Sequence, residues 1–81
     1  MRRGELRRFR HDVWVGVWME LNRTLSTSGS YKFKKGDIVL VTDAKYVHPR
    51  YPWDPHCCVL FDGMQINGVL QDYIIKHTEV I

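Results

Sequence analysis

The chain has 81 residues, of which 44% are hydrophobic and 26% charged, and its formal net charge is +3. This length fits one domain, residues 1–81, at a size where a single core stabilises only marginally, so association into a homo-oligomer is expected. The composition is that of a globular protein, and no apolar run is long enough to span a bilayer, which argues against a membrane partner.

The basic N-terminal segment, residues 1–12, carries the positive charge. Five arginines against one glutamate give the first ten residues a net charge of +4, so the rest of the chain carries −1 of the total of +3. Local positive charge attracts polyanions, and we predict phosphate contacts for Arg7, Arg8 and Arg10. Ordinary solvated charge is the alternative. No apolar segment of signal-peptide length follows Arg2 and Arg3, so a cytoplasmic location is expected.

Residues 4–10 fit either a short strand, with Leu6 and Arg8 facing away from Arg7 and Phe9, or the first turn of a helix. Residues 13–21 are clearer, because they alternate with the period of a strand. One face is apolar and would form the core face, and it holds Val13, Val15, Val17, Met19 and Leu21. The other face holds Trp14, Gly16, Trp18 and Glu20.

Trp14 and Trp18 flank Gly16 on this second face. Exposed tryptophans mark interfaces, because an indole buries a large area at little cost in rotamer entropy. We predict that Trp14 and Trp18 contact another subunit, and a platform for stacking bases is the alternative. If the two tryptophans instead faced the core, a neighbouring copy would have to cover the valines, so either arrangement favours association.

Residues 22–33 are rich in Ser, Thr and Gly and lack periodicity, so they are predicted to form a mobile loop. A strand then begins after Gly36 in the sequence "KKGDIVLVTD". Both of its faces are apolar, as in a strand buried between layers or in an oligomer. Ile38 and Leu40 lie on one face, and Val39 and Val41, which we predict to be further interface residues, lie on the other.

Residues 57–70 contain the dipeptide Asp62-Gly63, which suits a two-residue type I′ hairpin because both central residues need positive φ. Folding at this turn pairs Phe61 with Met64 and Val59 with Ile66 on one apolar face. Near residues 72–76 we predict one short helical or 3₁₀ turn, followed by a short last strand.

Four strand candidates, a short closing strand and tight turns in so short a chain predict an all-β fold. The expected architecture is a small, strongly bent, five-stranded barrel with a short 3₁₀ or helical turn before the last strand. Glycines supply positions at which such strands bend or turn.

The segment from "KKGDIVLVTD" to the final "TEVI", with "VLFDG" between them, resembles the Sm-like small β-barrels, and more specifically the small Sm-like proteins assigned to marine cyanophage. The resemblance implies rings formed by pairing of edge strands, and RNA binding by the loop between the second and third barrel strands. It also implies host cytoplasm as the location. The family's Asp and Met-Asn signature has no counterpart before this loop, so a specific uridine pocket is not implied.

The loop "DAKYVHPRYPWDPHC" would occupy that position. It interleaves cations with aromatic rings, and bases of single strands stack on such rings while cations meet the phosphates. We predict RNA or single-stranded DNA as the partner. The expected contacts are Lys45, Tyr46, His48, Arg50, Tyr51 and Trp53.

Prolines at positions 49, 52 and 55 would give this loop polyproline II geometry, with three residues per turn. Arg50, Trp53 and His56 would then share one side, and Tyr51 and Asp54 another. Two alternatives stay open. Tyr51 or Trp53 could fold back to cap the barrel, with the prolines only lowering loop entropy, or the segment could itself be a ligand for an aromatic-grooved domain.

The potential soft metal ligands are poorly spaced for zinc, because the adjacent Cys57 and Cys58 point to opposite faces of a strand and strain any disulfide between them. They are expected to be reduced and to bind no metal. The sequence also has no Gly-rich phosphate loop, paired carboxylates at helical spacing or Ser motif. No catalysis, cofactor or small-molecule substrate is predicted. A non-enzymatic phage structural or assembly module, which would use the same aromatic surfaces for protein contacts, is the alternative function.

Overall fold

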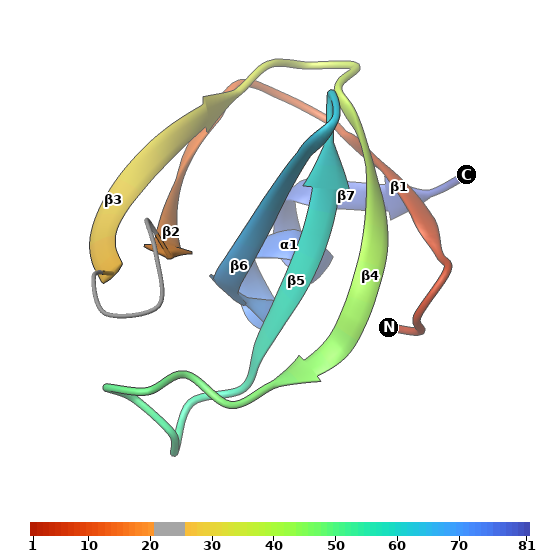
Figure 1. The fold of residues 1–81 in the computed structure, drawn as a ribbon. Helices are drawn as coiled ribbons and strands as arrows, with labels where there is room; N and C mark the ends of the chain where they lie inside the picture. Colours follow the sequence, from red (N-terminus) through yellow and green to blue (C-terminus); the bar gives the residue numbers. More distant parts are fainter. Residues whose placement is uncertain (21–25) are drawn as a thin grey trace.

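The computed structural model describes residues 1–20 and 26–81, and this part of the chain is all-β apart from one short helix. Seven strands form one antiparallel, strongly curved sheet in the order β3-β2-β6-β5-β4-β1-β7 (Figure 1). The elements are β1 (Leu6–Phe9), β2 (Val13–Glu20), β3 (Ser26–Phe33), β4 (Ile38–Tyr46), β5 (His56–Phe61), β6 (Met64–Leu70), α1 (Gln71–His77) and β7 (Thr78–Val80).

The expected five-stranded closed barrel is wrong in strand number and in closure. The sheet has two edges, β3 and β7, which are not paired with each other among the described residues. Two features raise the strand count above five. The N-terminal arginine segment forms β1 as a strand of its own, and residues 26–33 form β3. In the strand order, β3 lies at one end and β1 lies next to β7 at the other.

Strand β3 corrects the mobile loop predicted over residues 22–33; residues 22–25 lie outside the described part. The β2–β3 hairpin places Phe33 opposite Val13 and Tyr31 opposite Val15. Phe33 is fully buried and stacks on Phe9, with ring centroids 4.3 Å apart. Aromatic packing of this kind stabilises a strand that Ser and Gly disfavour.

The β5–β6 hairpin confirms the prediction made from Asp62-Gly63. Asp62 has φ of 50° and Gly63 has φ of 74°, and the register pairs Phe61 with Met64 and Val59 with Ile66. The predicted short helix and closing strand are also confirmed, as α1 and β7.

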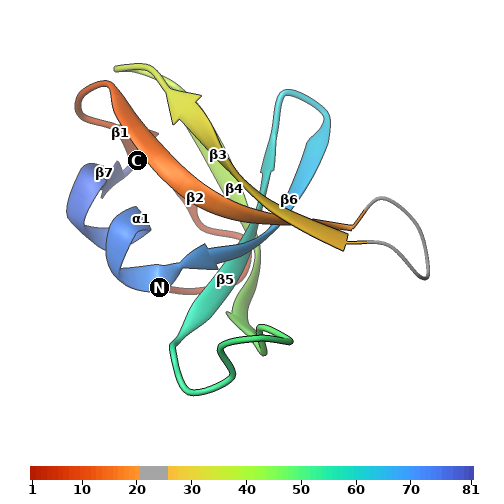
Figure 2. The same ribbon diagram turned by 90° about the vertical axis from the view of Figure 1, so that its left-hand side faces the viewer.

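The core lies inside the curved sheet and receives side chains from six strands and from α1. It confirms Val15 and Val17 as inward-facing residues of β2, and Val13 is partly buried against it. The side chains of Met19 and Leu21, also predicted for this face, lie outside the described set. Figure 2 shows α1 on the side of the molecule away from the β5–β6 turn. Ile74 of α1 is fully buried and fixes the helix to the core.

Candidate nucleic-acid interface

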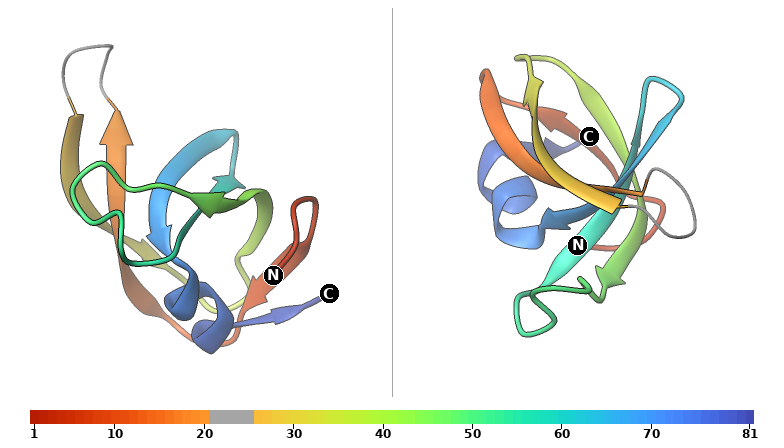
Figure 3. Two further views of the ribbon diagram at one scale, coloured as in Figure 1. Left: turned by 90° about the horizontal axis from the view of Figure 1, so that it is seen from below. Right: turned by 60° about the vertical axis from the view of Figure 1, so that its left-hand side comes forward.

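The proline loop, residues 47–55, connects β4 to β5 and extends toward the β2–β3 hairpin (Figures 1 and 3). The N–H of Asp54 donates to the carbonyl of Tyr51 at 3.1 Å, so residues 51–54 form a turn with Pro52 at its second position. Proline suits that position because its φ is already set. The loop is therefore a turn and not a continuous polyproline II helix.

His48 holds the start of this loop in place. Its Nδ1 accepts the backbone N–H of Arg50 at 3.0 Å and that of Tyr51 at 3.2 Å. Because Nδ1 accepts both, the proton of the neutral ring is on Nε2. Burial lowers the pKa of His48, and the nearby His56 and Arg50 lower it further, which favours this neutral form.

His56 and Gln71 hold the end of the loop. Nδ1 of His56 lies 2.8 Å from the carbonyl oxygen of Asp54, so this nitrogen carries a proton and donates it. The side-chain amide of Gln71 donates to the carbonyls of Ala44 and His56, at 2.5 and 3.1 Å, and so joins α1 to both strands that flank the loop. The backbone entering and leaving the loop is therefore fixed by side chains.

The predicted ridge of Arg50, Trp53 and His56 is not formed. His56 is buried, whereas Trp53 is 73% exposed. Tyr51 is 49% exposed and meets Trp53 edge to face, with ring centroids 5.9 Å apart. Neither ring caps the core, so two aromatic side chains of the loop are available to a ligand.

Trp18 lies beneath the loop and not on an outer surface. It is buried, its ring meets that of His48 at a centroid distance of 4.8 Å, and the guanidinium of Arg50 lies 5.4 Å from its centroid. The loop of the same chain thus covers Trp18, and no second copy is needed to cover it or the valines. Trp14 differs, because 65% of its side chain surface is exposed.

Two hollows flank the proline loop. The first has a volume of about 270 Å³ and lies between the loop, the β2–β3 hairpin and α1, where it is lined by Gly16, Val17, Gly29, His48, Tyr51, Asp54, His56, Gly68, Leu70 and Tyr73. The second, of about 350 Å³, lies on the side of β4 and is lined by residues that include Lys45, Tyr46 and Trp53. Lys45 and Arg50 are exposed, Tyr46 is partly buried, and His48 is buried at the wall of the first hollow.

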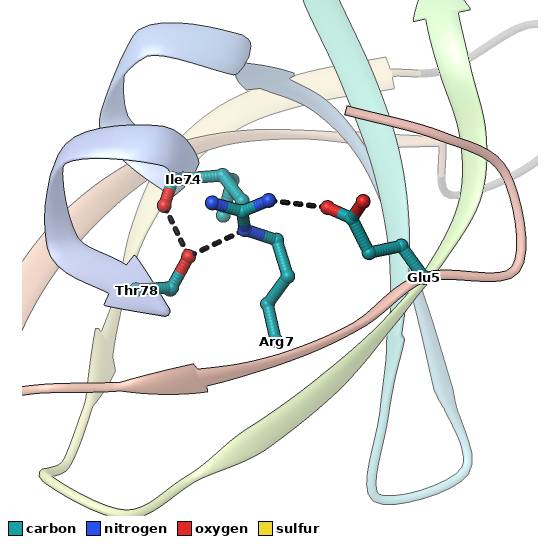
Figure 4. A network of polar contacts seen from close by, with 4 residues as sticks. All are labelled: Glu5, Arg7, Ile74 and Thr78. Carbon is teal, nitrogen blue, oxygen red and sulfur yellow. Dashed lines mark hydrogen bonds and ion pairs between the residues drawn. The ribbon is translucent and has the colours of Figure 1, made fainter. Parts of the chain in front are cut away.

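The N-terminal arginines are engaged in the fold. Arg7 is buried in β1; its Nε donates to Oγ1 of Thr78 at 2.8 Å, it pairs with Glu5, and the Thr78 hydroxyl donates to the carbonyl of Ile74 (Figure 4). Arg8 is exposed and pairs with Glu79 at 2.8 Å. Arg10 is also exposed and donates to the carbonyl of Lys76. Arg7 therefore has no surface to offer a phosphate.

Val39 and Val41 are fully buried in the chain's own core, so neither side chain offers a surface to a second copy. Cys57 and Cys58 are buried and form no disulfide, and burial raises the pKa of the Cys57 thiol to about 12. Among the side chains that the structure describes, no group of three or more His, Cys, Asp or Glu is arranged to hold a metal ion.

Sequence reasoning did not find Gly16, Gly29 and Tyr73 as residues of the first hollow. Tyr73 lies on α1 and is 42% exposed. The alternation of Tyr31 and Phe33 with polar residues was the one signal in the sequence that a strand pairs with β2 beside Gly16.

Within residues 1–20 and 26–81, no helix has the length and apolar character required to cross a membrane. Comparison of the chain with models of known families, with curated proteins and with solved structures finds no match.

Proposed function

We propose that this protein binds single-stranded nucleic acid, RNA or single-stranded DNA, through the proline loop and the hollows beside it, and has no catalytic activity of its own. One observation carries the proposal: Tyr51 and Trp53 are exposed on a loop whose ends are fixed, with the cations Lys45 and Arg50 on the same loop or beside it. Stacking of bases on exposed rings contributes about 1–3 kcal/mol per base by alanine substitution.

The fixed backbone supports this function. Backbone N–H groups of the loop already donate to His48, and the N–H of Asp54 closes the turn. The loop backbone is therefore ordered before a ligand binds. A surface that is ordered beforehand loses less conformational entropy on binding and so binds more tightly. Arg50 lies against the Trp18 ring, which leaves its charge at the surface beside Tyr51.

We further propose that the protein acts as a homo-oligomeric ring, as the Sm-like proteins it resembles do, and that it has a phage origin. Two features support association. Strands β3 and β7 present open edges, which pair readily with another strand. In addition, Leu6, Leu40 and Leu60 lie directly opposite one another on three neighbouring strands, beside the exposed Ile38. We call Leu6, Leu40, Leu60 and Ile38 the outer apolar row.

The same row also favours the second candidate function, a structural or assembly module that binds other protein. Leu6 and Ile38 are each 47% exposed, and Ile38 begins β4, whose other end leads into the proline loop. The two functions differ in which face is essential. Nucleic-acid binding requires Trp53 and Arg50, whereas assembly requires the outer apolar row.

Anisotropy titration of a labelled single-stranded oligonucleotide tests the proposal. Trp53→Ala is expected to weaken binding about fivefold or more, the lower end of the loss of one stacked base. Trp14→Ala is the matched control, because Trp14 is similarly exposed but lies on β2. Equal affinity of the wild-type protein and the Trp53→Ala variant would contradict the proposal. If Arg50→Ala with Trp53→Ala leaves binding intact while Leu6→Glu removes assembly, the module function is favoured.

A further inference from the structure

The first hollow has features that no general stacking surface requires. Its volume of about 270 Å³ lies just below the range of about 300–1,000 Å³ typical of pockets for drug-sized ligands. It therefore has room for one ring system and not for a folded peptide or a large cofactor. Residues from four parts of the fold surround it: the β2–β3 hairpin, the proline loop, the β5–β6 hairpin and α1.

Two glycines of the β2–β3 hairpin line this hollow. Gly16 and Gly29 lie in consecutive pairs of the hairpin register, so β-carbons at the two positions would point to opposite faces of the hairpin. A β-carbon built at either position meets no atom within 4 Å. Neither residue has the positive φ that would demand glycine. The fold does not require glycine at these two positions. The backbone there is left without side-chain cover, which lets a flat group approach closely.

The walls combine rings with two polar groups of opposite kind. Tyr51 comes from the loop and Tyr73 from α1, and both are partly exposed aromatic surfaces. His48 offers an N–H donor, because its Nδ1 is already occupied by two backbone N–H groups and its proton is on Nε2. Asp54 offers a carboxylate acceptor; its backbone N–H, and not its side chain, closes the turn.

We propose that the first hollow binds one unpaired nucleobase whose Watson–Crick edge carries an exocyclic amino group beside an acceptor ring nitrogen, that is, adenine or cytosine. The amino group donates to the Asp54 carboxylate, and the ring nitrogen accepts from Nε2–H of His48. Single-stranded bases are recognised in this way, by stacking and by bonds to their edges. Thymine and uracil present a carbonyl where the amino group would be, and a carboxylate repels it.

Arg50 is placed to neutralise the phosphate charge of the bound nucleotide. Its guanidinium lies over Trp18, next to His48 in the wall of the hollow, where it can meet the phosphate that joins the bound base to its neighbour. This assignment rests on the proposed function, since it names the part of the nucleic acid that the first hollow takes. It differs from that function in predicting a base preference, which phosphate contacts do not create.

The test compares three labelled oligonucleotides of equal length, oligo(dA), oligo(dC) and oligo(dT), at low salt. The wild-type protein is expected to bind oligo(dA) and oligo(dC) about tenfold more tightly than oligo(dT), the effect of one good base contact. Equal affinity for all three overturns the base assignment and leaves the proposed function standing. Failure to bind any of them overturns both.

Two variants test whether the base preference arises in the first hollow. Gly16→Val adds a side chain at the lining of the hollow and is expected to bring oligo(dA) down to the affinity of oligo(dT), whereas Trp14→Ala, two residues away on β2 and not lining the hollow, is expected to leave the preference intact. Asp54→Ala leaves the loop backbone unchanged and is expected to abolish the preference for amino-bearing bases. If Asp54→Ala instead strengthens binding of all three oligonucleotides equally, Asp54 only repels phosphate and the assignment is wrong.

Discussion

A β-carbon at Gly68 would lie 2.5 Å from the β-carbon of Trp18, a separation that real side chains do not adopt. Gly68 lies in the middle of β6, next to Asn67, which pairs with Trp18 of β2. Its φ of 66° is also in the left-handed region. The close approach of β6 to β2 lets Trp18 pack beneath the proline loop, so Gly68 links the sheet to the candidate interface.

Gly68→Ala is expected to destabilise the fold by about 2–4 kcal/mol, since it combines the strain of a left-handed alanine with overpacking against Trp18. Urea unfolding measures the loss. The matched control is Gly63→Ala, whose φ of 74° is similar but whose β-carbon would meet nothing within 4 Å. It should lose only the backbone contribution, about 1–2 kcal/mol. Equal losses in the two variants would show that Trp18 does not pack against β6 as described.

Stability is expected to fall on mild acidification because of His48. Burial lowers its folded pKa below the ordinary value of 6.5, and His56 and Arg50 add to the shift. A proton on Nδ1 would also remove the acceptor for two loop N–H groups. The contribution of neutral His48 is thus complete above the unfolded pKa of 6.5 and is lost as pH falls through the lower folded value.

His48→Asn separates this effect from general acid unfolding. The Asn side-chain oxygen can accept the same N–H groups and does not titrate near neutral pH. The variant should lose less stability than the wild-type protein between about pH 7 and pH 5, measured by urea midpoints. Some loss is expected to remain from His77, whose pKa is also lowered by burial and by the neighbouring His11, Lys76 and Arg10. An unchanged pH profile would contradict the role of His48.

Removal of Glu5 should cost far more than removal of Glu79. Glu5 is the carboxylate partner of the buried Arg7, so Glu5→Ala leaves a buried charge unpaired and is expected to cost about 3–5 kcal/mol. Glu79 pairs with the exposed Arg8, and Glu79→Ala is expected to cost at most about 1 kcal/mol. Urea unfolding of the two variants provides the comparison. Similar small losses would mean that the charge of Arg7 reaches solvent.

The proposed association is tested by light scattering of the purified protein. The wild-type mass is expected to be a multiple of the 9.6 kDa chain. Leu6→Glu places a charge in the outer apolar row and should shift the mass toward the monomer. Lys32→Glu changes an exposed charge on the edge strand β3. It should leave the mass unchanged if the outer apolar row forms the contact, and lower the mass if β3 pairs with another strand. A monomeric wild-type protein would exclude both routes of association.

Local patterns in the sequence predicted several parts of the fold correctly. Asp62-Gly63 predicted the β5–β6 turn, because the required positive φ restricts which residues can form it. The alternation around Val15 and Val17 predicted the inner face of β2. Strand β3 was missed because its backbone pairing depends on partners elsewhere in the chain, and Ser and Gly gave a weak local signal.

The sequence suggested which segment to consider as the candidate interface, but not the conformation of that segment. The mixture of Arg50, Tyr51 and Trp53 identified the proline loop, yet proline spacing did not reveal the turn that Asp54 closes. The burial of Arg7 and Trp18 could not be predicted from the neighbouring sequence. It depends on contacts with distant residues, Thr78 for Arg7 and His48 for Trp18. The tertiary contacts decide which of the charged and aromatic side chains stay exposed.

The most direct test of the central claim is the affinity of the wild-type protein for a single-stranded oligonucleotide over a salt series, with Arg50→Ala measured in parallel. The protein is expected to bind at low salt, and its affinity should weaken steeply as salt increases, with a log–log slope of about −0.7 for each phosphate contacted. Arg50→Ala should give a shallower slope, smaller by about one contact. Absence of binding at low salt, or an affinity independent of salt, would contradict the claim.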